Sequence, residues 1–126
     1  MIFVTADRCR SQLERLTQLL VSAFPGSTIY QHTDPERVLH DVLSHPVDAV
    51  FLAAESDKTR NLDVVRMLRR EKSDLSVFIL SQTEDLRKAA AEAGADGYFV
   101  QPVTEQQLRE AIRSAQNEDK ASCQFV

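Results

Sequence analysis

The chain has 126 residues, 43% of them hydrophobic, which is enough for one domain that buries a core without metals or disulfides. Its 15 basic and 19 acidic residues give a net charge of −4, and the basic residues are dispersed, which argues against a nucleic-acid or membrane-surface binder. No apolar run approaches the roughly 18 residues of a membrane span, and the apolar start is too short for a signal peptide, so we expect a cytoplasmic protein.

Short apolar runs alternate along the chain with segments of helical periodicity, and there are five of each. The first run, residues 2–4, precedes a helical segment that ends at Pro25. A weaker run at 27–31 is followed by Asp34 and Pro35, an N-cap residue and a proline suited to the first turn of a helix. The apolar stripe predicted for that helix consists of Val38, Leu39, Val42 and Leu43.

The middle of the chain continues the same alternation. The third apolar run, residues 47–53, is typical of a buried strand, and polar residues without glycine follow it at 55–61. The apolar positions predicted for the next helix are Leu62, Val65, Met67 and Leu68. The fourth run, 77–80, is continuously apolar, as in strands covered by helices on both faces. Residues 84–93 predict an alanine-rich helix with acidic residues in its first turn, ended by Gly94.

The last strand is predicted at 98–100, and Thr104 with Gln107 forms a capping-box pattern before the final helix. The periodicity then ends, so we expect one domain over residues 1–117 and a flexible tail over 118–126. Strands and helices in strict alternation, joined by right-handed crossovers, predict an α/β fold. It is a (βα)5 doubly wound parallel five-stranded sheet, in which functional groups collect at the carboxyl ends of the strands.

Four stretches carry a resemblance to a known family: residues 33–36, 46–52, 95–100 and 102–108. Together with the alternation over residues 1–114, they resemble the receiver domains of two-component response regulators, most closely those of LytTR-type regulators. The resemblance implies the flavodoxin-like strand order 2-1-3-4-5. It also implies a role in phosphorelay signal transduction and no enzymatic activity.

The resemblance further implies a phosphorylation site at the carboxyl ends of the strands, where this chain departs from the family. It places the metal-binding acidic pair on Thr5 and Ala6. It places the phosphate-accepting aspartate on Ala53 and the lysine on Gln101. A methyl group cannot accept a phosphoryl group, and without an acceptor neither magnesium nor the lysine has a purpose. We therefore expect a degenerate pocket without metal or catalytic residues, formed by Thr5, Ala6, Asp7, Ala53, Ser81, Gln101 and Pro102.

Neighbouring carboxylates leave an alternative open. Glu55 and Asp57 follow shortly after Ala53 in the sequence, and Asp7 follows the first strand. An active phosphorelay receiver that uses one of these acids as a substitute acceptor is the competing hypothesis, although the supporting lysine is missing. Residues 5–9 contain no glycine, which argues against a nucleotide or flavin phosphate loop, so we expect no cofactor.

The resemblance also implies an output surface on the fourth helix, fifth strand and fifth helix. Ser81 and Tyr98 match the two positions that couple the pocket to this surface in phosphorylatable receivers. Their presence is compatible with a surface fixed in one conformation, and equally with a loop-capping serine and a strand-filling tyrosine. The surface is predicted to carry Tyr98, Asp85, Arg87, Lys88, Glu92, Gln106, Arg109, Glu110 and Arg113. Such mixed charges either pair across a two-fold axis or are simply solvated.

The leading prediction is a degenerate receiver, or pseudo-receiver, that works by protein interaction without aspartate phosphorylation. Its partner is another protein, or the output domain of a transcription regulator outside this chain, with a homodimer as a further option. We expect no direct binding to nucleic acid or membrane. The sequence leaves open whether the chain is a stand-alone module or the receiver of a longer regulator.

Overall fold

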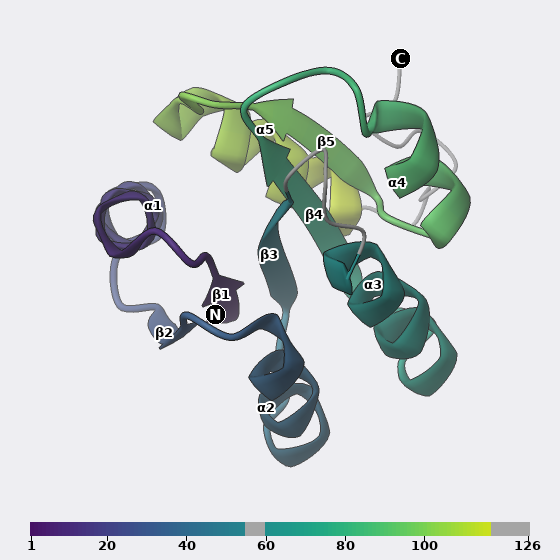
Figure 1. Cartoon of the computed structure of the whole chain (residues 1–126). Coiled ribbons are helices and arrows are strands. Elements are labelled where there is room, and N and C mark those ends of the chain that lie inside the picture. Colours follow the sequence, from purple (N-terminus) through teal and green to yellow (C-terminus); the bar gives the residue numbers. More distant parts are fainter. Residues whose placement is uncertain (55–59, 117–126) are drawn as a thin grey trace.

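The computed structural model of the chain describes residues 1–54 and 60–116. In it, a parallel sheet of five strands lies between two layers of helices (Figure 1). The strands are β1 (Ile2–Ala6), β2 (Thr28–His32), β3 (Ala49–Ala54), β4 (Ser76–Ser81) and β5 (Gly97–Val100). Their order is β2-β1-β3-β4-β5 and every pair is parallel, which confirms the predicted fold class and strand order.

The helices lie on both faces of the sheet. They are α1 (Arg10–Ala23), the 3-10 turn η1 (Pro35–Arg37), α2 (Val38–Ser44), α3 (Arg60–Glu71), α4 (Arg87–Ala93) and α5 (Glu105–Gln116). Helices α1 and α5 cover one face, and α2, α3 and α4 cover the other (Figure 1). No helix in the described part of the chain is long and apolar enough to cross a membrane.

Side-chain alternation along the strands divides the core into two layers, because successive residues of a strand point to opposite faces. Phe3, Phe51 and Phe78 pack towards α1 and α5, with the rings of Phe51 and Phe78 stacked at 5.1 Å between centroids. Val4 and Val50 point to the opposite layer, beneath α2, α3 and α4. Both faces are therefore buried, which explains the continuously apolar strands in the sequence.

Three local signals in the sequence are confirmed at helix ends. The Asp34 carboxylate accepts a hydrogen bond from the Glu36 backbone N–H at 3.0 Å, although the turn it caps is a 3-10 turn. The capping box is formed, since Gln107 Oε1 accepts from the Thr104 N–H at 2.8 Å and Thr104 Oγ1 accepts from the Gln107 N–H at 3.2 Å. Gly94 ends α4 with a φ of 108°, a left-handed conformation that favours glycine.

Two details differ from the sequence-based expectation. Helix α4 begins at Arg87 rather than at Glu84, because the Arg87 N–H bonds to the Glu84 carbonyl in a turn that precedes the helix. No acidic residue therefore lies in its first turn. Leu43 and Met67, predicted within apolar stripes, are 54% and 42% exposed because the buried stripes of α2 and α3 are narrower than the sequence pattern. The boundary at residue 117 and the tail remain predictions, since residues 117–126 lie outside the described residues.

Candidate functional site

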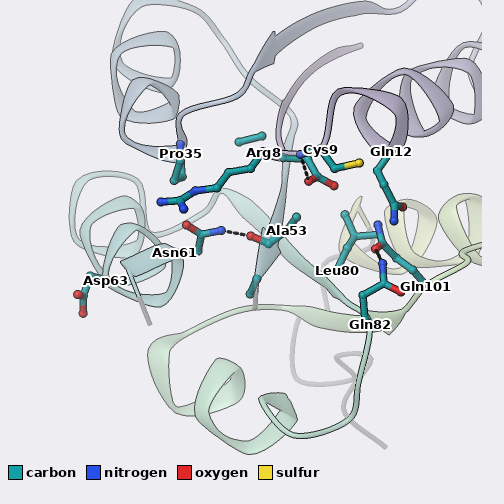
Figure 2. A pocket seen from close by; sticks show the side chains of 13 residues that line it. Arg8, Cys9, Gln12, Pro35, Ala53, Asn61, Asp63, Leu80, Gln82 and Gln101 are labelled. Carbon is teal, nitrogen blue, oxygen red and sulfur yellow. Dashed lines mark hydrogen bonds between the residues drawn. The ribbon is translucent and has the colours of Figure 1, made fainter. Parts of the chain in front are cut away.

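A cavity of about 430 Å³ opens at the carboxyl ends of the strands, where the fold predicts functional groups (Figure 2). Residues from the ends of β1, β3 and β4, from the segment after β5 and from the starts of α1 and α3 line it. They are Ala6, Asp7, Arg8, Cys9, Gln12, Pro35, Ala53, Ala54, Asn61, Asp63, Leu80, Gln82 and Gln101. Four of the seven residues predicted for the pocket are in this lining, namely Ala6, Asp7, Ala53 and Gln101, whereas Thr5, Ser81 and Pro102 are not.

Ala53 lies in the middle of this lining. It is paired in the sheet with Leu80, and its carbonyl accepts a hydrogen bond from the Asn61 side-chain amide (Figure 2). Ala6, at the end of β1, and Ala54 add two further methyl groups to the lining. The part of the cavity that follows the strand ends is therefore small and apolar, and it offers no carboxylate at the position of Ala53.

Thr5 is one of the predicted pocket residues that the structure places outside the cavity. Thr5 is fully buried and is not among the residues that line the cavity. By strand alternation it shares the face of Phe3, towards α1 and α5, and its hydroxyl makes no hydrogen bond to any described residue. The two residues after β1 that meet the cavity are Ala6 and Asp7. One carboxylate is thus kept at this strand end, a residue further along than the resemblance implied.

Asp7 is held by the start of α1. Its Oδ1 accepts the Cys9 backbone N–H at 2.8 Å, and its own N–H donates to the His32 carbonyl at 3.1 Å. The neighbouring Cys9 side chain is exposed, and a hydrogen bond from the Ser11 hydroxyl, with a smaller contribution from the Gln12 N–H, lowers the pKa of its thiol. Both side chains are therefore organised by the first turn of α1.

The lining residues do not fit a magnesium ion. Asp7 is the only carboxylate of the described lining near the alanines, because Asp63 pairs with Arg66 at 2.7 Å and points away from the centre (Figure 2). In the described residues, no group of three histidine, cysteine, aspartate or glutamate side chains is placed to hold a metal. Magnesium in phosphoryl sites uses one or two carboxylates together with phosphate oxygens, and this donor set supplies one that is already hydrogen-bonded.

The polar part of the cavity consists of amides and one guanidinium group. Gln82 donates to Gln101 Oε1 at 2.6 Å, and Gln12 lies on the same side of Ala53 (Figure 2). Arg8 reaches across the opposite side, towards Pro35 and Asn61 (Figure 2). In the described part of the chain Arg8 forms no ion pair. No sequence motif singles out Arg8, Gln12 or Asn61, because the start of α1 and the start of α3 meet here only after folding.

Ser81 and Tyr98 do not line the cavity but hold the segment beside it. Ser81 Oγ accepts the Thr83 N–H at 3.3 Å, and the Tyr98 hydroxyl donates to the Thr83 carbonyl. Arg87 lies over the Tyr98 ring, 4.9 Å from its centroid, and is itself held by Glu84. The hydrogen bonds from Arg87 lower the pKa of Glu84. Both predicted coupling residues thus converge on Thr83.

The predicted output surface is largely solvent-exposed, with one exception. Tyr98 is 2% exposed, so it belongs to the core and reaches the surface only through Arg87. Two local pairs occupy charges on α5: Arg109 with Glu105 at 2.7 Å, and Gln106 with Glu110 at 3.1 Å. The other exposed members are Asp85, Lys88, Glu92 and Arg113.

The remaining residues singled out from the sequence do not line the described cavity. Pro102 is exposed after the cis bond to Gln101, outside the main cavity. Glu55 and Asp57 lie outside the described residues.

Comparisons of the sequence point to one family. Residues 3–113 match the family model described as the response regulator receiver domain. The response regulator MprA of Mycolicibacterium vanbaalenii is 28% identical over 113 residues, which cover 88% of this chain and 48% of that protein. MprA of Mycobacterium avium is 28% identical over 127 residues, covering 96% of this chain and 55% of that protein. The chain spans about half the length of the curated relatives it matches.

Solved structures share the fold. A response regulator receiver domain protein from Clostridium thermocellum superposes with a TM-score of 0.80 at 23% identity, covering 95% of this chain and 97% of that chain. A putative pilus assembly-related protein from Burkholderia pseudomallei superposes with a TM-score of 0.78 at 16% identity, covering 98% and 91%. The strand order, the cavity at the carboxyl ends and the family match over residues 3–113 lead to one conclusion: the chain belongs to the response regulator receiver domain family.

Proposed function

We propose that this receiver is degenerate: it signals by binding a protein partner and is not switched by aspartate phosphorylation. The observation that carries the proposal is Ala53, a methyl group in the middle of the cavity where the family resemblance implies the acceptor aspartate. Ala6 and Gln101 in the same lining make the loss consistent, since one removes a metal ligand and the other the phosphate-binding ammonium. Without an acceptor carboxylate at position 53, a lysine ammonium at position 101 and a second metal-binding acid at position 6, phosphoryl transfer to position 53 has no chemical basis.

The contacts around Thr83 support a fixed output surface. In this structure Ser81 and Tyr98 both bond to Thr83, and Arg87 with Glu84 covers the Tyr98 ring. These bonds use no group of the cavity, so they persist without any phosphate. A surface that keeps one conformation suits a constitutive partner, and that partner is a second protein or the output domain of a longer regulator.

The finer assignments follow from the sequence. We propose that the receiver is closest to those of LytTR-type regulators, that residues 1–117 form the folded domain with a flexible tail at 118–126, and that it acts in the cytoplasm without binding membrane or nucleic acid directly.

The mixed charges of α4 and α5 are the proposed homodimer surface. Sedimentation of the purified chain tests the dimer. A monomer at high concentration overturns the homodimer and does not affect the proposal that the receiver is degenerate.

A second candidate function rests on one observation: the Asp7 carboxylate lines the same cavity. An active receiver that accepts phosphate on Asp7, or on Glu55 or Asp57, is the competing hypothesis. The hydrogen bond from the Cys9 N–H to Asp7 weighs against Asp7, because it stabilises the carboxylate and lowers its nucleophilicity.

The test is a titration of the chain with beryllofluoride and magnesium, monitored by amide chemical shifts. We expect no saturable shift at Ser81 and Tyr98, because there is no carboxylate at position 53 to bind the phosphoryl mimic. The control is the triple variant Ala6→Asp, Ala53→Asp, Gln101→Lys, which restores the missing groups and is expected to respond. Saturable shifts in the natural chain overturn the proposal, and their loss in Asp7→Asn would then assign the acceptor to Asp7.

A further inference from the structure

We propose that the cavity binds a small organic carboxylate that has an apolar body and an uncharged hydrogen-bonding group at its far end. This inference rests on the proposed function, since a site with no need to hold phosphate is free to hold another ligand. The carboxylate would meet Arg8, the apolar body the alanines of the strand ends, and the uncharged group the glutamine amides.

Arg8 is the cation suited to the carboxylate. Among the lining residues that the structure describes, it is the only cationic one. It forms no ion pair within the described part of the chain, and it extends along the cavity rather than into solvent away from it (Figure 2). A guanidinium group presents paired N–H donors whose geometry matches the two oxygens of a carboxylate.

The two carboxylates of the lining do not cancel this preference. Asp7 accepts the Cys9 N–H, and Asp63 pairs with Arg66 and points away from the cavity centre. The Asp7 carboxylate lies at the start of α1, whereas the Arg8 guanidinium lies on the side of Pro35 and Asn61 (Figure 2), so the two charged groups serve different parts of the cavity.

The opposite side of the cavity is suited to an uncharged polar group. Gln82 and Gln101 are hydrogen-bonded to one another through one N–H and one carbonyl, so each amide keeps further donor or acceptor capacity. Gln12 adds a third amide on this side of Ala53 (Figure 2). Neutral amides bind amide or hydroxyl groups by paired hydrogen bonds and offer no charge to phosphate.

The size and the middle of the cavity suit an organic body between these ends. Ala53 and Leu80 lie between Arg8 and the glutamines (Figure 2), and Ala6 and Ala54 add methyl groups to the same lining. The volume of about 430 Å³ lies within the range of about 300–1,000 Å³ typical of small-molecule sites. Inorganic phosphate would fill little of this space and would leave the apolar part in contact with water.

The probe for the test is 4-carbamoylbenzoate, which combines a carboxylate, an aromatic ring and a primary amide. Binding to the full 126-residue chain is measured by isothermal titration calorimetry and by amide shifts around Ala53 and Gln101. Terephthalamide has the same shape without the carboxylate, and inorganic phosphate has the charge without the apolar body. We expect saturable binding of 4-carbamoylbenzoate, and binding about tenfold weaker for terephthalamide, because a charge-assisted contact is lost.

Two charge-matched variants locate the carboxylate. Arg8→Gln is expected to weaken binding of 4-carbamoylbenzoate about tenfold. Arg10→Gln removes the same charge from the same end of α1, but Arg10 is exposed and does not line the cavity, so affinity should stay within about twofold. Arg8 is exposed and unpaired among the described residues, so its variant should remain folded, which the dispersion of the amide spectrum checks.

The possible outcomes separate this inference from the proposed function. No saturable binding up to the solubility limit overturns the inference, as does equal binding of terephthalamide, preferential binding of phosphate, or equal affinity in Arg8→Gln. None of these results affects the degenerate receiver, which fails only if beryllofluoride with magnesium shifts Ser81 and Tyr98. Binding that depends on both the carboxylate and Arg8 supports the inference.

Discussion

Charged side chains have different roles at the two ends of the parallel strands, here called the amino edge and the carboxyl edge of the sheet. At the amino edge, Asp48 and Asp96 each exchange two hydrogen bonds with a neighbouring strand. The Asp48 carboxylate accepts the Ile2 N–H at 2.7 Å while its own N–H donates to the Ile2 carbonyl at 2.8 Å. Asp96 repeats this with Val77 at 2.8 and 2.7 Å. Here the aspartates tie the starts of β1 to β3 and of β4 to β5.

Arg69 extends this network. It pairs with Asp96 at 2.6 Å and donates to the Gly94 and Leu75 carbonyls at 3.0 and 2.6 Å, linking α3 to the segments before β4 and β5. At the carboxyl edge, by contrast, alanines and amides occupy the positions that phosphoryl chemistry would need. We infer that the charged residues at the amino edge stabilise the fold. The acidic residues and the lysine that the family resemblance implies at the carboxyl edge would be needed only for phosphoryl transfer.

The largest expected effect comes from the amino edge. Asp96→Ala removes the partner of Arg69 and of the Val77 N–H, so we expect a loss of about 2–3 kcal/mol in the free energy of unfolding, measured in urea. Asp63→Ala is the matched control, because its ion pair with Arg66 is exposed and should contribute less than about 0.5 kcal/mol. Equal losses in the two variants would break the contrast between the edges.

A cap at the carboxyl edge gives an intermediate effect. Thr104→Ala opens the capping box of α5, and we expect a loss of about 1 kcal/mol in the free energy of unfolding. Thr33→Ala, an exposed threonine outside any helix, should change it by less than about 0.5 kcal/mol. If Thr104→Ala changed the free energy of unfolding no more than Thr33→Ala does, the capping box would not contribute to stability at the carboxyl edge.

The amide pair in the cavity should matter least for stability. Gln101→Ala removes the hydrogen bond between the side chains of Gln101 and Gln82, and Gln82 is exposed to solvent. We therefore expect the free energy of unfolding in urea to change by less than about 0.5 kcal/mol. A loss comparable to that of Asp96→Ala would mean that the fold depends on Gln101. The contrast between structural and functional charges would then fail.

The smallest effect concerns the thiol at the rim of the cavity. The Ser11 hydroxyl is the main cause of the lowered pKa of Cys9, so Ser11→Ala should raise that pKa. The thiolate is the reactive form, so near neutral pH the variant should react more slowly with iodoacetamide than the natural chain. The dependence of the alkylation rate on pH measures the shift, and an unchanged profile would assign the lowered pKa to the helix backbone alone.

Much of the fold was predictable because its signals are local. The capping box at Thr104 and the left-handed Gly94 each depend on residues within a few positions. The start of α4 was not predictable from the acidic residues before it. Leu43 and Met67 were assigned to buried stripes although they are exposed, because periodicity alone does not fix how wide a stripe its neighbours cover.

The candidate site was predictable only in part. Ala53, Ala6 and Gln101 were identified through the family resemblance and do meet in one cavity. Thr5 was assigned there too but is fully buried and does not line the cavity, and Tyr98 was placed on a surface but is buried. Arg8 and Asn61 were missed, because neither belongs to a motif and both reach the cavity from separate helix starts.

By itself, the sequence determined the fold class, the order of elements and the absence of a carboxylate at position 53. These follow from apolar periodicity and residue identity, which act over a few neighbouring positions. Only the tertiary structure decided that Asp7 rather than Thr5 meets the cavity, that Tyr98 lies under Arg87, and that Arg8 and the glutamines line its two sides. The physical reason is that alternation fixes the face to which a strand side chain points, whereas the helices and loops that cover that face decide what the side chain meets.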